Sequence, residues 1–217
     1  MKNHIIKVLL SSITLMFNAP FVKAQKVFNQ AQLILKDGST KIGFIREIND
    51  ERYTQNILFK LTKEESKIQK LNLSDLKSIF LIESKLTYEC KEIDLTMTEE
   101  KDDNLPYIKN IEDYKSKIKT DKDVFLMKKI LTGNIKMYEI IDKMGQAHYV
   151  VQKLDDQLIE LQRIRYKREY NNSIFINSLD IFKDQLETLF SDCSRQYSLP
   201  SLKFSKEELL NAVNFYN

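Results

Sequence analysis

The 217-residue sequence contains no tryptophan, two cysteines, two histidines and only four glycines. Without tryptophan, the chain lacks the commonest side chain on which proteins stack sugar rings. The glycines (Gly38, Gly43, Gly133 and Gly145) are too far apart for a glycine-rich phosphate loop. A zinc site needs three or four ligands at short spacings, which two remote cysteines and one histidine beyond the first 24 residues do not supply. We therefore expect no metal and no cofactor.

Few residues are available for nucleophilic catalysis. A catalytic triad needs a histidine that an acid orients toward a nucleophile, but His148 lies within an expected strand, where a half-exposed side chain is the simplest interpretation. No serine has the glycine-flanked elbow of a hydrolase. Cys193 is expected at the C-terminal end of a helix, where the helix dipole raises a thiol pKa. Carboxylate pairs can come from distant parts of a chain, so Glu139 and Glu160 remain candidates for hydrolysis.

The first 24 residues have the three-part layout of a secretory signal peptide. Lys2 and Lys7 precede the mostly apolar run Val8–Phe17, and the expected cleavage lies between Ala24 and Gln25. This run is far shorter than the ~20 apolar residues that cross a bilayer, and no other stretch approaches that length. We therefore expect an exported protein without a transmembrane span after signal removal, located in the periplasm, at the outer membrane or outside the cell.

The charge balance argues against a nucleic-acid partner. The signal contains Lys2, Lys7 and Lys23, and without them the 34 basic residues fall to the same number as the 31 acidic residues. Nucleic-acid binding normally requires a basic excess on one face. The strongest basic cluster, Arg163–Asn172, has interleaved tyrosines and could contact an acidic polymer, but we interpret it as an exposed loop.

The two cysteines, Cys90 and Cys193, leave two alternatives open. In an oxidising compartment they could pair, and closing so long a loop would stabilise the fold by roughly 4.7 kcal/mol in the chain-entropy model. Alternatively, each is a free thiol that packs as a small apolar group.

Residues 25–96 are predicted to form a β-rich domain, a small barrel or sandwich. Short apolar or alternating segments predict six strands, at 31–35, 41–45, 56–61, 68–73, 79–82 and 85–93. Asp37-Gly38 supplies the first hairpin turn, and Gly43 indicates a bulge or a close backbone approach. Six short strands without a long helical pattern between them favour an antiparallel sheet.

Residues 97–123 are expected to be a linker. Thr98–Asn104 has few apolar side chains, Pro106 follows, and a short helix is expected over Ile108–Ile118. The acidic run Glu99–Asp103 lacks the glycine and the alternating ligands of a calcium loop, so we interpret it as a solvated segment.

Residues 124–217 are predicted to form an antiparallel meander covered by two helices. Four strands are expected, at 124–131, 135–141, 146–153 and 157–162. Apolar residues at helical spacing predict a helix between Ser178 and Asp192, and Ser205 with Glu208 predicts the start of the last helix. Helices that follow a meander cover one of its faces, so the expected fold class is α+β.

Several segments together resemble a group of uncharacterised secreted proteins of Bacteroidetes-type bacteria. These segments are Leu33–Ile45, Ile57–Lys60, Leu73–Phe80, Phe125–Glu139, Tyr149-Val150, Leu186–Cys193 and Phe204–Asn217. Longer relatives in this group can carry an outer-membrane β-barrel. The resemblance implies an envelope or secreted module, and it supplies neither an activity nor catalytic residues.

The sequence therefore predicts an exported, non-enzymatic module that binds or scaffolds an envelope protein or a glycan. One alternative is a carboxylate-dependent envelope hydrolase that uses Glu139 or Glu160. Another is a glycan-binding module that uses some of the ten tyrosines.

Overall fold

The structure, a computed structural model, describes residues 27–49, 52–97, 104–108, 119–154, 156–193 and 197–217. The predicted signal with its cleavage site at Ala24 and Gln25 lies outside the described residues, as do the acidic run Glu99–Asp103 and nearly all of the predicted linker helix. Within the described ranges, no helix combines the length and the apolar character needed to cross a bilayer.

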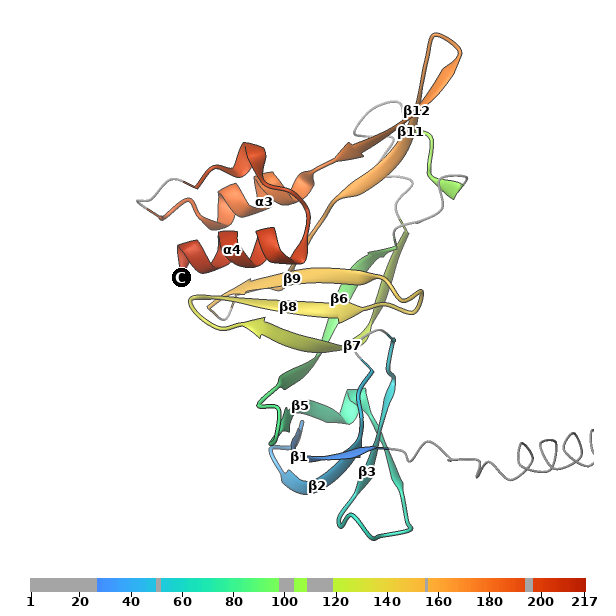
Figure 1. The fold of residues 1–217 in the computed structure, drawn as a ribbon, viewed down its shortest axis with the longest axis vertical. Helices are drawn as coiled ribbons and strands as arrows, with labels where there is room; N and C mark the ends of the chain where they lie inside the picture. The colour runs from blue at the N-terminus through green and yellow to red at the C-terminus, as the bar shows by residue number, and fades with distance from the viewer. Residues whose placement is uncertain (1–26, 50–51, 98–103, 109–118, 155, 194–196) are drawn as a thin grey trace, which may run out of the picture.

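Ten strands form one antiparallel sheet in the order β10-β9-β8-β7-β6-β5-β1-β2-β3-β4 (Figure 1). Their bounds are β1 Phe28–Leu35, β2 Thr40–Arg46, β3 Asn56–Lys60, β4 Gln69–Asn72, β5 Leu76–Leu81, β6 Thr87–Met97, β7 Lys119–Leu131, β8 Ile135–Ile141, β9 Ala147–Lys153 and β10 Ile159–Leu161. The short 3-10 helix η1 (Leu73–Asp75) leads from β4 to β5, which returns to pair with β1. The predicted α+β class, with its meander and two helices, is confirmed.

Strands β6 and β7 join the two predicted β blocks. They pair from Tyr88 opposite Lys128 to Met97 opposite Lys119. Side chains alternate between the two faces of a strand. As a result, even-numbered residues such as Cys90 pack in the N-terminal core, whereas odd-numbered residues such as Leu95 and Phe125 pack in a second core.

The N-terminal core fills the curl of β1–β6. Its members are the buried apolar residues Ala31, Leu33, Ile45, Ile57, Phe59, Leu73, Leu76, Ile79, Leu81, Tyr88 and Cys90. A Cβ atom at Gly43 would lie 2.6 Å from the Phe59 ring and would also meet the carbonyl oxygen of Lys60. The close backbone approach expected at Gly43 is therefore confirmed. β3 packs so closely against this position that a side chain larger than that of glycine would collide with it.

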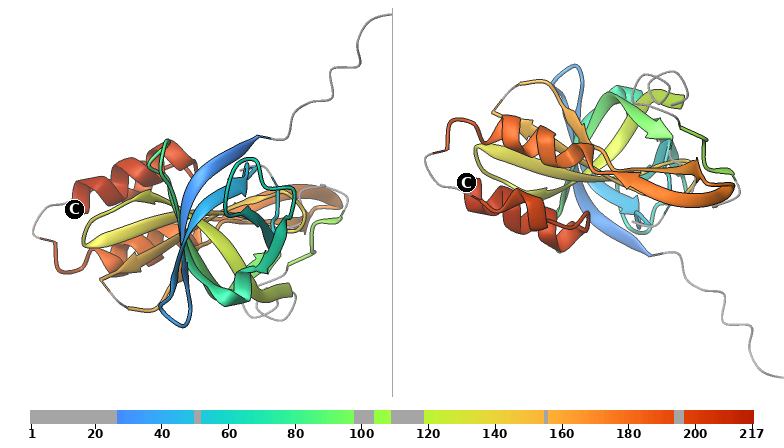
Figure 2. Two further views of the ribbon diagram at one scale, coloured as in Figure 1. Left: turned by 90° about the horizontal axis from the view of Figure 1, so that it is seen from below. Right: turned by 90° about the horizontal axis from the view of Figure 1, so that it is seen from above.

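The second core lies on the concave face of the meander. It contains Ile93, Leu95, Phe125, Met127, Tyr138, Ile140 and Val150. The sheet curls so strongly here that the Thr96 N–H in β6 donates to the Glu160 carboxylate in β10 at 2.8 Å, although β7, β8 and β9 lie between them in the sheet. Figure 2 shows this curl from two further directions.

Two helices cover the opposite face of the meander. Helices α3 (Ile181–Leu189) and α4 (Lys206–Tyr216) bury Phe182, Leu186 and Leu209 against Met137, Val151 and other residues of β8–β10. The predicted cap of the last helix is confirmed, because the Ser205 hydroxyl accepts a hydrogen bond from the Glu208 N–H at 3.3 Å.

The basic segment Arg163–Asn172 is not the exposed loop that we expected. It contains β11 (Ile164–Tyr170), which pairs with β12 (Ser173–Leu179) in a separate two-stranded sheet. Asn171 and Asn172 form the turn, with φ values of 50° and 59°; positive φ at both central residues gives the turn that matches strand twist. Consequently α3 begins at Ile181 and not at Ser178, and Leu179 belongs to β12.

Replacing Gly43 by alanine tests the packing of the N-terminal core. We expect Gly43→Ala to destabilise the protein by about 1–3 kcal/mol, because the new methyl group would press on Phe59 and on the backbone of β3. Denaturant unfolding measures the change. Ile42→Ala is the control, since that neighbouring side chain is 59% exposed; equal stability losses in both variants would contradict the account.

Candidate functional site

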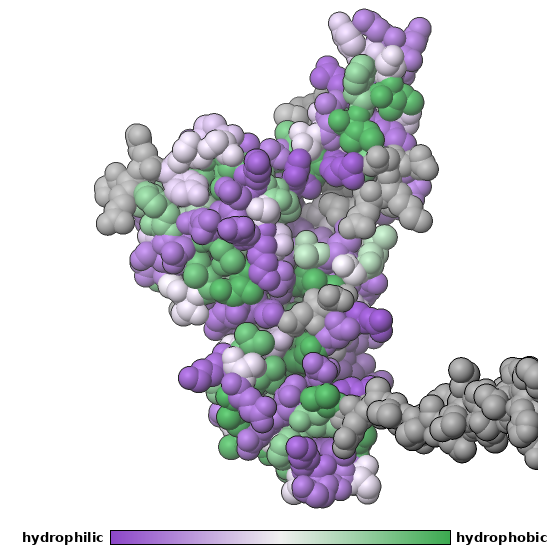
Figure 3. Space-filling model, in the orientation of Figure 1, coloured by the Kyte–Doolittle hydropathy of each residue, from purple (hydrophilic) through white to green (hydrophobic). Residues whose placement is uncertain are grey.

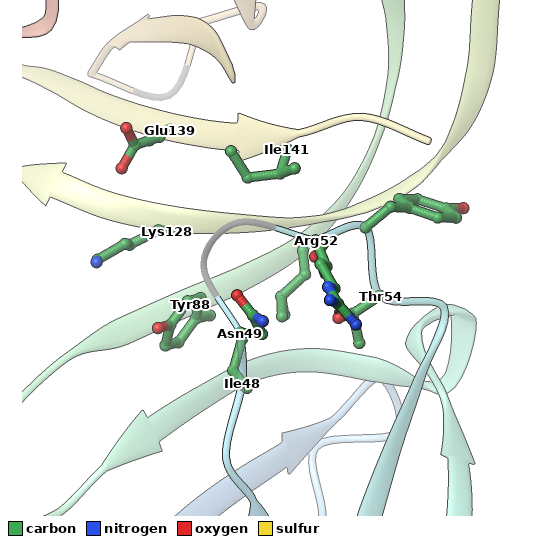
Figure 4. A pocket seen from close by; sticks show the side chains of 10 residues that line it. Ile48, Asn49, Arg52, Thr54, Tyr88, Lys128, Glu139 and Ile141 are labelled. Atoms are coloured by element: carbon green, nitrogen blue, oxygen red, sulfur yellow. Dashed lines mark hydrogen bonds between the residues drawn. The ribbon is translucent and has the colours of Figure 1, made fainter. Parts of the chain in front are cut away.

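Two small cavities lie along the described part of the ten-stranded sheet. One has a volume of about 20 Å³ and lies where Asn49 and Arg52 face Glu139 and Ile141 of β8 (Figure 4). The other, of about 50 Å³, is lined by His148 and eight neighbouring residues. A buried water needs about 10–15 Å³, whereas pockets for small molecules measure roughly 300–1,000 Å³. These two cavities have room for a few waters.

His148 lies between two carboxylates in the second cavity. Its Nδ1 is 2.6 Å from Glu160 Oε1, and its Nε2 is 3.2 Å from Asp142 Oδ2. All three residues are buried, so the half-exposed position expected for His148 is wrong. The other oxygen of Asp142 accepts the N–H groups of Met144 and Gln146, each at 2.8 Å, which fixes this carboxylate in the β8–β9 turn.

The charges around His148 favour its protonated form. Burial by itself lowers the pKa of the imidazole, but hydrogen bonds and electrostatic attraction from Glu160 and Asp142 outweigh it and raise the pKa above the ordinary 6.5. With both nitrogens bonded to carboxylates, the ring is held as a structural bridge. Neither ring nitrogen is therefore available to activate a nucleophile.

A second polar cluster closes the other end of the concave face. Glu89 lies 2.7 Å from Lys91 and 2.6 Å from Lys129, and it accepts the Tyr138 hydroxyl at 3.1 Å. Burial raises the pKa of Glu89, but the two lysines lower it more strongly, to about 2. The interior of the meander is thus an apolar core with an internally paired cluster at each end.

The two carboxylates proposed for hydrolysis do not come together. Glu160 lies opposite Val150, on the concave face, whereas Glu139 lies opposite Tyr149. Adjacent residues of β9 point to opposite faces, so Glu139 and Glu160 do as well. Glu139 instead pairs with Lys206 of α4 at 2.7 Å. Among the described residues, no three His, Cys, Asp or Glu side chains are placed to hold a metal ion.

Both cysteines are free thiols in the structure, so the pairing of Cys90 with Cys193 is not formed. Cys90 packs in the N-terminal core, and its burial raises the pKa of the thiol to about 12. Cys193 follows α3 and is partly exposed.

The β11–β12 hairpin carries a continuous run of exposed apolar side chains. It projects beyond the helices and the sheet (Figure 1), and hydrophobic side chains gather on it (Figure 3). Three consecutive residues of β12 are exposed despite their size: Ile174 by 58%, Phe175 by 50% and Ile176 by 43%. A water-exposed run of this kind on a strand is a typical interaction surface.

The backbone pattern shows which edge of the hairpin can pair further. The N–H and C=O of Lys167 in β11 bond to Pro106 and Ile108, on the outer side of β11. In an antiparallel ladder, opposite residues either bond to each other or both point away. Ile176 lies opposite Lys167, so its N–H and C=O point outward from the β12 edge, as do those of Ile174.

A hollow of about 510 Å³ adjoins the opposite edge, beside Tyr107, Ile108 and the end of β11. Its border includes Ile108, beyond which residues 109–118 lie outside the described chain, and we assign no ligand to it.

The sequence offered a usable signal for this site. Ile174-Phe175-Ile176 is a β-branched and aromatic run one residue after Asn171-Asn172, a pattern typical of a hairpin. The neighbouring cations of β11 obscured it, since charged segments are usually interpreted as loops. The partners of His148, in contrast, depend on the strand pairing and could not be assigned from spacing.

Comparison with protein-family models, curated proteins and solved structures gives no match for this chain.

Alkylation in the native state tests the placement of the two thiols. We expect iodoacetamide to modify Cys193 and to leave Cys90 unmodified, because Cys90 is buried with a raised thiol pKa. In denaturant both should react. Intact-mass and peptide mass spectrometry measure the labels, and the absence of labelling at both sites until a reductant is added would show a disulfide.

Proposed function

We propose that this protein is an exported, non-enzymatic binding module of the cell envelope that takes up an extended segment of a partner protein along β12. The signal-like N-terminus and the resemblance to secreted envelope proteins support the location. The observation that carries the proposal is the edge of β12, where Ile174, Phe175 and Ile176 are exposed beside outward-pointing backbone groups.

Addition of a partner strand would use both the outward-pointing backbone groups and the exposed apolar side chains of the β12 edge. An extended segment that lies against β12 would form main-chain hydrogen bonds with Ile174 and Ile176, which supply affinity independent of sequence. Its side chains would meet Ile174 and Ile176 on one face of the hairpin and Phe175 on the other. Apolar residues in the segment would therefore be selected, because they bury this exposed surface.

The charge of the hairpin favours an acidic partner segment. Strand β11 contains three cations, Arg165, Lys167 and Arg168, and one acid, Glu169. Strand β12 contains no charged residue. A bound segment would lie one strand away from β11, within reach of long basic side chains, so apolar residues alternating with acidic ones fit best.

The cavities and clusters elsewhere support binding over catalysis. The polar groups of the concave face are bonded to one another, and Glu139 and Glu160 lie on opposite faces of the sheet. The hairpin, in contrast, presents exposed apolar side chains beside the outward-pointing backbone groups of Ile174 and Ile176.

Peptide binding tests the proposal. The probes are eight-residue peptides that alternate valine with glutamate, with lysine in place of glutamate, or with proline at every second position. We expect the glutamate series to bind at least tenfold more tightly than the lysine series and the proline series not to bind, because proline removes ladder donors. Fluorescence anisotropy measures the affinities.

A matched pair of variants locates the binding edge. Ile176→Pro removes one outward-pointing N–H without removing a bond between β11 and β12, and we expect at least a tenfold loss of affinity. Ile176→Thr retains the N–H and the β-branched shape, so it should bind more tightly than Ile176→Pro. Circular dichroism checks that both variants are folded. Equal affinity of the two variants, or no binding by any peptide, would overturn the proposed function.

A further inference from the structure

The buried bridge at His148 also lies at the base of the hairpin. Glu160 is the middle residue of β10, a three-residue strand that pairs with β9 at the edge of the described sheet. Only Gln162 and Arg163 separate β10 from β11, which begins at Ile164. Contacts that hold β10 in place therefore also hold the start of β11, the first strand of the hairpin.

Glu160 connects β10 to two other strands. One carboxylate oxygen contacts His148 of β9, and the other accepts the Thr96 N–H of β6 at 2.8 Å. The Gln162 amide donates to the Thr96 hydroxyl at 2.7 Å and extends the same contact. On the helix side, the amide of Gln185 in α3 bonds to the Glu160 carbonyl and the Gln162 N–H. These last two bonds involve no titrating group.

The bridge is complete only when the imidazole is protonated. An imidazolium donates from both nitrogens, one to Glu160 and one to Asp142, whereas a neutral ring has one donor and one acceptor. After loss of the proton, one carboxylate faces a ring nitrogen that no longer donates to it, and both carboxylates lose their buried cation.

Two cations close to this cluster are already paired. Arg163 lines the same cavity, but its Nε is 3.3 Å from Asp180. Lys143 is next to Asp142 in the chain, and its ammonium group contacts Asp121 at 2.8 Å and Asp123 at 3.1 Å. The remaining residues that line the cavity are uncharged: Thr96, Ala147, Leu161, Gln162, Ile164 and Phe204.

We propose that His148 is a proton-dependent latch, which in its charged form ties β10 and the base of the β11–β12 hairpin to the sheet and on deprotonation loosens them. The contacts of Gln185 and the pairing with β9 persist, so β10 loosens without leaving the sheet. The latch concerns the mobility of the hairpin base and stands independently of what the hairpin binds.

The direction of the pH effect follows from the charges. The folded protein holds the His148 proton more tightly than the unfolded chain, because the pKa is raised above 6.5. The stabilisation is therefore fully present below about pH 6.5 and is lost as the pH rises through the raised value.

Nuclear magnetic resonance of the full chain tests the latch. The chain contains only His4 and His148, so comparison with His148→Gln assigns the imidazole signals. We expect His148 to titrate above 6.5. We also expect amide protection of residues 159–164, corrected for the intrinsic exchange rate, to fall at least tenfold over the same pH interval. In His148→Gln, this protection should not change with pH.

Two further variants test whether the titration of His148 depends on its contact with Glu160. Glu160→Gln should lower the pKa of His148, because it removes the strongest favourable contact of the ring. Glu139→Gln, on the other face of the sheet, should leave the titration unchanged. A His148 pKa at or below 6.5, or protection of residues 159–164 that is independent of pH in the unmodified protein, would overturn the proposal without affecting the peptide-binding test.

Discussion

The pairing of β6 with β7 is the constraint on which the rest of the structure depends. Cys90 and Leu126 face the N-terminal core while Leu95 and Phe125 face the concave core, so one strand pair serves both. A slip of one residue would place each set of side chains on the wrong face. The same curl brings β10 to β6, which allows Glu160 to reach Thr96 and positions the strand that leads into the hairpin. The packing of the two cores, the His148 bridge and the position of the β11–β12 hairpin thus all depend on the register between β6 and β7.

Polar and charged groups are arranged differently in the meander and in the β11–β12 hairpin. Within the meander, Glu89 is paired with Lys91 and Lys129, and His148 is paired with Asp142 and Glu160. Removing one member of such a cluster leaves the remaining charges without a partner, which destabilises the fold. The hairpin has the opposite character, since large apolar side chains remain in water beside a strand edge. Natural proteins usually protect such edges, which is why we propose that a partner strand covers this one.

Local sequence patterns were sufficient for most of the strands and for the last helix. The glycine-containing connections on either side of Ile135–Ile141 gave that strand with its observed bounds, and Ser205 marked the start of α4 because capping is a local interaction. The hairpin was missed because its cations suggested a loop, although the paired asparagines carried the turn signal. The surroundings of His148 could not be predicted at all. They require β8, β9 and β10 to lie side by side, and only the folded register brings Asp142 and Glu160 to the two ring nitrogens.

The central claim is that the edge of β12 is open in the free protein and pairs with a partner strand. Amide exchange at single-residue resolution in the β11–β12 hairpin, measured with and without a bound valine–glutamate peptide, tests it most directly. The account predicts an alternating pattern, in which the amides of Ile174 and Ile176 exchange rapidly in the free protein and become protected by the peptide, while the Phe175 amide is protected in both states. Equal exchange at all three positions, or protection by the peptide elsewhere on the protein only, would contradict it.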